Sequence, residues 1–103
     1  VFTTASSDAI IPPTNHIFTA FTVLAAATFD ASGGLVAEAA TKFANTEDAA
    51  GDLAAGSETN NEGSGGVQIT NSNATFPAGV TIHGRYTEID VAGGSIIAYY
   101  ERQ

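Results

Sequence analysis

Alternating apolar and polar residues between positions 76 and 100 predict β-strands near the C-terminal end of the chain. Val80 and Ile82 lie on one side of this run, and Ile89 and Val91 follow with the opposite parity. Side chains alternate between the two faces of a strand, so a one-residue shift is needed to bring all four to one core. A β-bulge near Gly84 would supply that shift and is predicted there.

The glycine pair Gly93-Gly94 lies between two β-branched runs and predicts a two-residue hairpin turn. Such a turn places Val91 opposite Ile96 and Ile89 opposite Ala98, on a face that we expect to be core. The second face then carries Tyr86, Glu88, Asp90, Ile97, Tyr99 and Glu101. A three-residue loop would instead exchange the two faces. In either case the hairpin carries more apolar surface than one face of a small sheet can bury.

The N-terminal segment 1–13 has apolar ends around a polar centre and stops at Pro12-Pro13. Two structures fit this pattern. It is either an extended arm anchored on a neighbouring subunit or an ordinary edge strand. In the first case the anchors are Val1, Phe2, Ile10 and Ile11.

Three further segments complete the predicted architecture. Residues 16–24 read as a strand with apolar residues on both faces, which is typical of a central or interface strand. Residues 35–44 are Ala-rich with an apolar stripe and predict either a short helix or a strand. Residues 45–66 are polar and Gly-rich, and they predict a mobile surface loop. The whole pattern indicates one domain over 1–103, mainly β, with an antiparallel sandwich or barrel-like sheet and, if 35–44 is helical, one short helix.

Composition suggests that this domain has little stability in reserve. The chain has 103 residues, and alanine makes up much of the 44% that is hydrophobic. It contains no cysteine, so disulfides cannot reinforce the fold. Oligomerisation is a common way for such small domains to bury more apolar surface. We therefore expect a homo-oligomer, either a dimer or a trimer.

The charge is strongly acidic, with eleven Asp and Glu against three Lys and Arg and a net charge of −8. Binding to nucleic acid needs clustered cations, and an anionic membrane repels such a surface. Neither is expected as a partner. No apolar run approaches the ~20 residues of a membrane span, and no signal peptide is visible.

No arrangement of residues predicts catalysis or a cofactor. His16 and His83 have no acid or nucleophile at a spacing that implies contact. Residues 45–52 are rich in acids but do not follow the EF-hand spacing, so no metal is expected. Arg85 is one of three cations and stands beside Tyr86. It could form an ion pair with an acid of another subunit or an ordinary surface pair within the chain.

The C-terminal sequence PAGVTIHGRYTEIDVAGGSIIAYY resembles the ends of a group of short structural proteins of tailed bacteriophages. The shared features are the turn Pro77-Ala78-Gly79, the strand from Val80 to Thr87 and the strand from Gly94 to Tyr99. A weaker similarity covers residues 12–29. The resemblance implies a virion component, most simply a decoration (cement) protein on the capsid surface, assembled in the host cytoplasm.

The resemblance also implies a non-enzymatic role, with the major capsid protein and further copies of the chain as partners. From the residues themselves we expect contacts through the arm anchors and through Arg85, Tyr86, Ile97 and Tyr99. A tail or fibre subunit, or a module that binds host glycans, is the alternative. A small hydrolase is the weakest of the possibilities.

Overall fold

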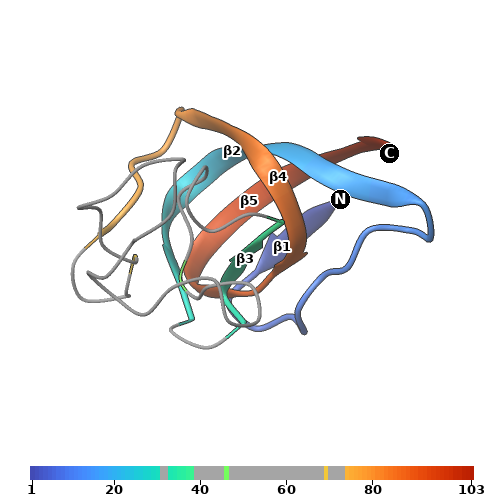
Figure 1. The fold of residues 1–103 in the computed structure, drawn as a ribbon. Coiled ribbons are helices and arrows are strands. Elements are labelled where there is room, and N and C mark those ends of the chain that lie inside the picture. Colours follow the sequence, from blue (N-terminus) through green and yellow to red (C-terminus); the bar gives the residue numbers. More distant parts are fainter. Residues whose placement is uncertain (31–32, 39–45, 47–68, 70–73) are drawn as a thin grey trace, which may run out of the picture.

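The computed structural model describes residues 1–30, 33–38, 46, 69 and 74–103. Within them lie five strands, namely β1 (Phe2–Thr4), β2 (His16–Phe29), β3 (Leu35–Ala37), β4 (Thr81–Ile89) and β5 (Val91–Arg102). They form one antiparallel sheet in the order β1-β5-β2-β4-β3 (Figure 1). The prediction of a mainly β, antiparallel fold is confirmed. The sheet remains open and does not close into a barrel.

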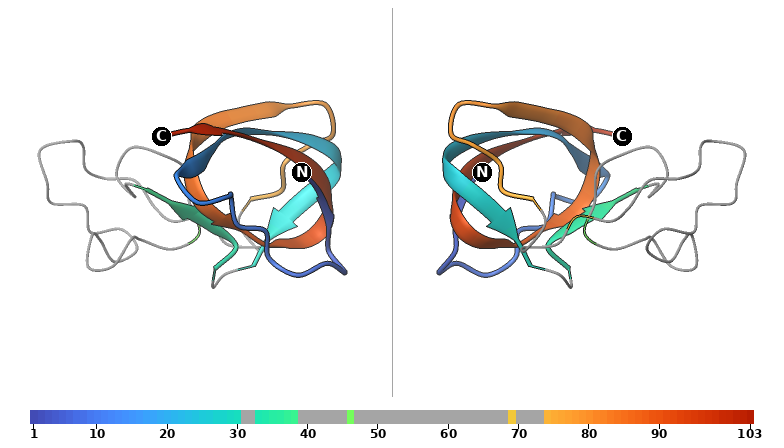
Figure 2. Two further views of the ribbon diagram at one scale, coloured as in Figure 1. Left: turned by 90° about the vertical axis from the view of Figure 1, so that its right-hand side faces the viewer. Right: turned by 90° about the vertical axis from the view of Figure 1, so that its left-hand side faces the viewer.

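The long strand β2 organises the sheet. It pairs with β4 on one side and with β5 on the other, so the prediction of a central strand is confirmed. Its register against β5 shifts at four places, beginning between Phe18 and Ala20. Such irregularities bend a strand and increase its twist. The sheet is accordingly strongly curved, and its strands wrap around the core in the two views of Figure 2.

Aromatic side chains fill the inside of this curve. The ring of Phe21 lies 5.2 Å from Phe29 and 6.0 Å from both Phe76 and Tyr86, measured between centroids. Burying a side chain of this size stabilises a fold by about 1.5–3 kcal/mol. The rest of the core consists of Phe18 and of aliphatic side chains, mainly Val23, Leu35, Ile89, Val91 and Ile96.

The predicted hairpin at Gly93-Gly94 is wrong. Both glycines lie inside β5, and β4 and β5 flank β2 instead of pairing with each other. Gly94 has a φ of 78°, and a Cβ atom there would lie 2.1 Å from the carbonyl oxygen of Ala26. At Gly93 it would lie 2.9 Å from Thr28 Oγ1. The glycines therefore let two curved strands approach closely, and they do not form a turn.

The predicted core face is correct although its pairing is not. Ile89, Val91, Ile96 and Ala98 are all buried. Val91 lies opposite Phe29 of β2 and not opposite Ile96. The period of two decides which side chains face inward, whereas the strand that lies alongside depends on the whole topology.

A bulge does occur at Gly84, as predicted. Between the pairs Phe18–Tyr86 and Ala20–His83, β4 contributes two residues and β2 only one. The ring of Tyr86 lies over Gly84, where an added Cβ would be 2.6 Å from the ring. The bulge does not supply the predicted change of parity, because Ile82 and Tyr86 on either side of it both face the core. The change that brings Ile89 inward comes at a second irregularity, between the pairs of Tyr86 and Glu88 with β3.

Of the two alternatives predicted for 35–44, the strand is the one found at its beginning, because Leu35–Ala37 form strand β3. No described residue is helical. The rest of that segment, 39–44, lies outside the described residues, as does nearly all of the predicted loop over 45–66. At the N-terminus, β1 pairs with β5 of its own chain, and Ile10 bridges to Ile89. The edge-strand alternative thus describes this segment better than a free arm.

Candidate interaction surface

The face of the sheet turned away from the core carries an exposed apolar patch. Phe2 on β1 lies directly opposite Ile97 on β5, and Ile97 lies opposite Thr22 on β2. Thr22 in turn shares a 2.9 Å hydrogen bond between hydroxyls with Thr81 on β4. A row of side chains therefore crosses four strands, with its apolar end at β1 and its polar end at β4.

Two more apolar side chains join this row. Tyr99 follows the buried Ala98 on β5, and Leu24 follows the buried Val23 on β2, so both point outward. Phe2 is 60% exposed, Leu24 47% and Tyr99 46%. We call the set Phe2, Leu24, Ile97 and Tyr99 the outer patch. Exposed apolar groups that gather in this way mark a site of interaction more often than scattered ones do.

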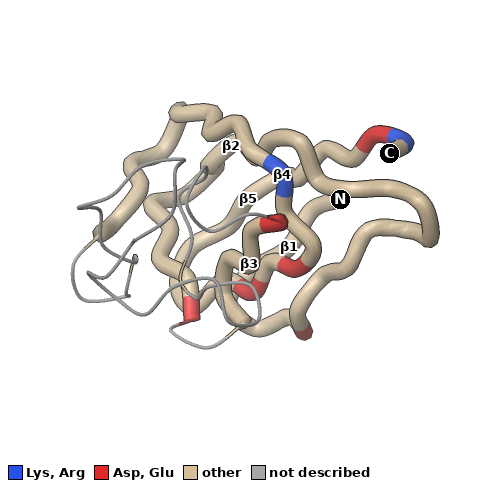
Figure 3. Tube along the Cα trace, viewed as in Figure 1, with Lys and Arg blue, Asp and Glu red and all other residues tan. Residues whose placement is uncertain are grey.

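Formal charge is almost absent from the strands that carry the outer patch. β1 and β2 contain no Asp, Glu, Lys or Arg, and β5 has only Glu101 and Arg102 at its end. Among the described residues, the other acids lie in the connections and on the β3–β4 side (Figure 3). In a chain with a net charge of −8, this separation leaves one face that another protein can approach without strong repulsion.

The two edge strands of the sheet, β1 and β3, differ in what covers their outer sides. At β3, the backbone N–H of Leu35 donates to Thr46 Oγ1 at 2.7 Å, and the N–H of Thr46 donates to the carbonyl of Leu35 at 2.9 Å. Thr46 is only 3% exposed. This residue therefore covers the outer side of β3, even though the chain around it is not described.

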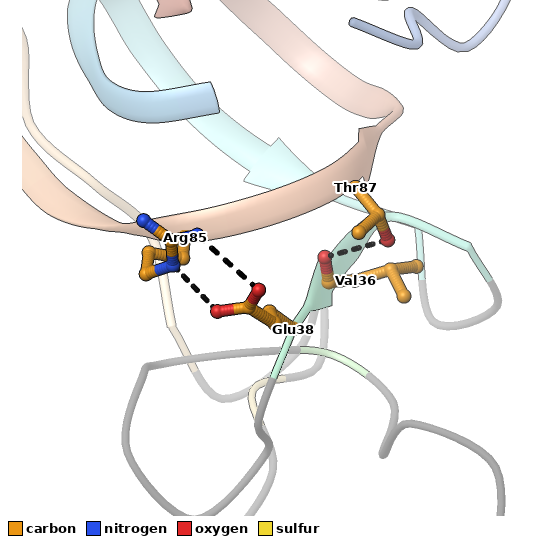
Figure 4. Close-up of polar contacts among 4 residues, drawn as sticks. All are labelled: Val36, Glu38, Arg85 and Thr87. Carbon is orange, nitrogen blue, oxygen red and sulfur yellow. Dashed lines mark hydrogen bonds and ion pairs between the residues drawn. The ribbon is translucent and has the colours of Figure 1, made fainter. Parts of the chain in front are cut away.

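An ion pair lies beside the same edge. Arg85 Nε donates to Glu38 Oε2 at 2.5 Å, and Arg85 Nη2 donates to Glu38 Oε1 at 3.3 Å (Figure 4). Thr87 Oγ1 also donates to the carbonyl of Val36 at 3.4 Å. Arg85 thus forms the pair within the chain that was one of its two predicted roles. The side chains of Arg85 and Glu38 are 40% and 41% exposed, so their ion pair lies at the surface and contributes only modestly to stability.

An acidic corner lies where β4 passes into β5. The N–H of Asp30 donates to the carbonyl of Asp90, and the N–H of Asp90 donates to the carbonyl of Gly34. Burial raises the pKa of the Asp90 carboxyl above its ordinary value, and so do a hydrogen bond with Asp30 and the charges of Asp30, Glu88 and Asp8. Within the described residues, however, no three His, Cys, Asp or Glu side chains are grouped to hold a metal ion.

The structure separates the predicted contact residues into two groups. Phe2, Ile97 and Tyr99 come together in the outer patch, and Val1 lies next to them, bonded to Ala98 through both backbone groups. Ile11 is exposed, while Ile10 packs against the core. Except for Ile10, these residues reach the surface, so their role in contacts with a partner can be tested by substitution.

Tyr86 is different, because it is completely buried and offers no surface to a partner. Burial also raises the pKa of its hydroxyl to about 12. Sequence reasoning put Leu24 on the second face of its strand but did not connect it with Ile97. The sequence has no signal that would bring these two residues together, because they belong to strands far apart in the chain.

The histidines lie on different parts of the sheet. His16 Nδ1 is 2.9 Å from the carbonyl oxygen of Thr14, and its ring meets Tyr100 edge-on at 5.4 Å between centroids. His83 lies on β4 opposite Ala20. The two side chains therefore do not form a common site.

Comparison of the chain with protein-family models, curated proteins and solved structures yields no match in any of the three. The described part of the chain also contains no helix of the length and apolarity that would cross a membrane. The surface itself is thus the basis for any functional assignment.

Proposed function

We propose that the chain is a non-enzymatic structural subunit that self-associates and decorates the outside of an assembled virion shell. The observation that carries the proposal is the outer patch, an exposed apolar surface on strands almost without charge. Aromatic side chains such as Phe2 and Tyr99 are favoured anchors of protein interfaces. The resemblance of the C-terminal strands to short phage structural proteins supplies the setting.

The proposal has a simple thermodynamic basis. A protein that binds the assembled shell, and not its separate subunits, shifts the assembly equilibrium toward the shell by mass action. The capsid protein is the partner in this scheme. The outer patch is large enough to provide several anchors, and the acidic remainder of the surface keeps the free subunit soluble.

The test uses purified, empty shells of a tailed phage and the full chain. We expect saturable co-sedimentation with the shells, in a number that follows the shell lattice, and no binding to unassembled capsid protein. Tyr99→Asp should reduce the binding about tenfold or more, because it puts a carboxylate into a desolvated contact. Ile11→Asp is the matched control, since Ile11 is exposed but lies outside the outer patch.

Absence of binding to any shell, at concentrations where the chain is folded, would contradict the proposal. Binding in only a few copies per particle would indicate instead that the chain is a tail or fibre subunit. Saturable binding to a glycan array that Tyr99→Ala abolishes would favour the glycan-binding alternative.

A further inference from the structure

The backbone of β1 presents hydrogen-bonding groups to the outside of the sheet. Val1 and Ala98 exchange two backbone hydrogen bonds, and the N–H of Ala5 donates to the carbonyl of Gly94. In an antiparallel ladder, successive residues turn their N–H and C=O alternately toward and away from the neighbouring strand. The odd-numbered residues of this segment therefore face β5. Phe2 and Thr4 turn their N–H groups the other way, where the described residues include no further strand.

Apart from its shortness of three residues, β1 lacks the side chains that usually protect an edge strand. Lysine, proline and charged residues that point inward commonly prevent one sheet edge from pairing with another. Residues 1–7 contain none of them, and the exposed side chain at the centre of the edge is Phe2. An edge of this kind is suited to pair with a further strand.

Charge identifies the strand that fits there. A basic partner would gain little from this edge, because the nearby strands are almost uncharged and the acids of the described residues lie elsewhere. A second copy of the chain also has a charge of −8, and it can approach closely only through a neutral surface. An antiparallel pair of identical strands is self-complementary about a two-fold axis.

We infer that two copies of the chain associate through antiparallel pairing of their β1 strands. In this arrangement the outward groups of Phe2 in one copy face those of Thr4 in the other, and the sheet continues across the two-fold axis. The carbonyl of Thr4 also accepts from the N–H of Ser7 at 3.0 Å within its own chain, so it would be shared between two donors. The Phe2 side chains lie on the same outer face as Ile97, so the two outer patches join into one. The inference deepens the proposed function, on which it rests for the importance of self-association.

The test is the mass of the full chain in solution, by sedimentation velocity over about a hundredfold range of concentration. We expect a monomer–dimer equilibrium. Thr4→Pro removes an outward N–H and leaves the ladder with β5 intact, a position where proline is tolerated in edge strands. It should weaken the dimer about tenfold or more, because it removes hydrogen bonds and adds a steric block.

Two further variants make the result decisive. Phe2→Lys keeps the backbone and places like charges across the axis, so it should weaken the dimer as Thr4→Pro does. Ile11→Ser removes exposed apolar surface outside both β1 and the outer patch, and should leave the dimer unchanged. Circular dichroism and thermal melts confirm that each variant is folded.

A wild-type chain that stays monomeric over the whole range would overturn the inference. So would a dimer that Ile11→Ser dissociates and that neither Thr4→Pro nor Phe2→Lys affects. The shell co-sedimentation assay separates this result from the proposed function. Shell binding by a monomeric chain would contradict only the inference of a β1 dimer. A dimer that binds no shell would contradict only the proposed decoration role.

Discussion

Strands β1 and β3 end the same sheet on opposite sides, but their free sides are built differently. The outer side of β3 is covered by Thr46, and the ion pair of Arg85 with Glu38 lies beside it. The outer side of β1 carries an exposed Phe2 and no charged residue. A sheet edge without protection can pair with other chains and aggregate, so most proteins protect their edges. The difference therefore suggests that β3 is closed for stability and β1 is open for association.

The two strands also differ in their connection to the core. Leu35 of β3 is completely buried in the main cluster. In β1, Phe2 is exposed, and the inward Thr3 is the one buried residue of that strand. Substitutions at the two edges should consequently act on different properties, folding at β3 and association at β1.

The largest effect is expected from Leu35→Ala. Truncating a buried leucine leaves a cavity and costs about 2–5 kcal/mol of unfolding free energy. Phe2→Ala is the matched change at β1, and because Phe2 is 60% exposed it should alter the stability of the monomer by less than about 0.5 kcal/mol. Urea denaturation at low protein concentration measures both. Similar losses from the two variants would contradict the division between the edges.

Gly94→Ala should come next, because this glycine holds β5 against β2 at the point where β1 begins to pair. The positive φ alone costs a non-glycine residue about 1–2 kcal/mol, and the clash with Ala26 adds about 1–3 kcal/mol. Gly79→Ala is the control, since Gly79 has a φ of 95° but no atom within 4 Å of the added Cβ. If thermal melts give equal losses for both, then close strand approach is not the reason for the glycine.

Thr46→Val tests the cover of β3 directly. It keeps the shape of the side chain but leaves the buried N–H of Leu35 without its hydroxyl acceptor, which should cost about 1–3 kcal/mol. Thr46→Ser retains the hydroxyl and should lose much less. Equal stability of the valine and serine variants in denaturant titrations would show that this hydrogen bond does not close the edge.

The smallest effect is expected at the acidic corner, which lies near the β3 side. The pKa of Asp90 is raised in the folded chain, so its stabilising contribution is complete below the ordinary pKa and is lost as the pH rises through the raised value. Asp90→Asn should therefore stabilise the fold at neutral pH, by about 0.2–1 kcal/mol after solvent screening. The gain should shrink in acid. A gain that does not change with pH in melts from acid to neutral would refute this sign.

The sequence allowed the inward faces to be predicted but not the neighbours of each strand. Alternation placed Ile89, Val91, Ile96 and Ala98 in the core because that pattern is local. The hairpin prediction failed because a glycine pair is used both for tight turns and for close approach of strands. Nothing near Gly93-Gly94 in the sequence distinguishes these uses.

Tyr86 and Glu38 show that the sequence also did not predict where these individual side chains lie. A second irregularity, between the pairs of Glu88 and Tyr86 with β3, turns Tyr86 inward against the expected parity. Glu38 pairs with Arg85 across a separation of 47 residues, and it follows β3, a segment for which the sequence left a helix and a strand open. Phe2 was expected in an N-terminal arm and Ile97 and Tyr99 on one face of a hairpin, and the sequence did not indicate that Phe2 lies opposite Ile97.

Residue-resolved amide hydrogen exchange, measured as the protein concentration is raised, tests the contrast between the edges most directly. We predict that the amides of Phe2 and Thr4 exchange fast in dilute solution and become protected as the concentration rises, while the amide of Leu35 is protected throughout. Protection of Phe2 and Thr4 that does not depend on concentration would contradict the account, because the β1 edge would then not be the surface through which copies associate.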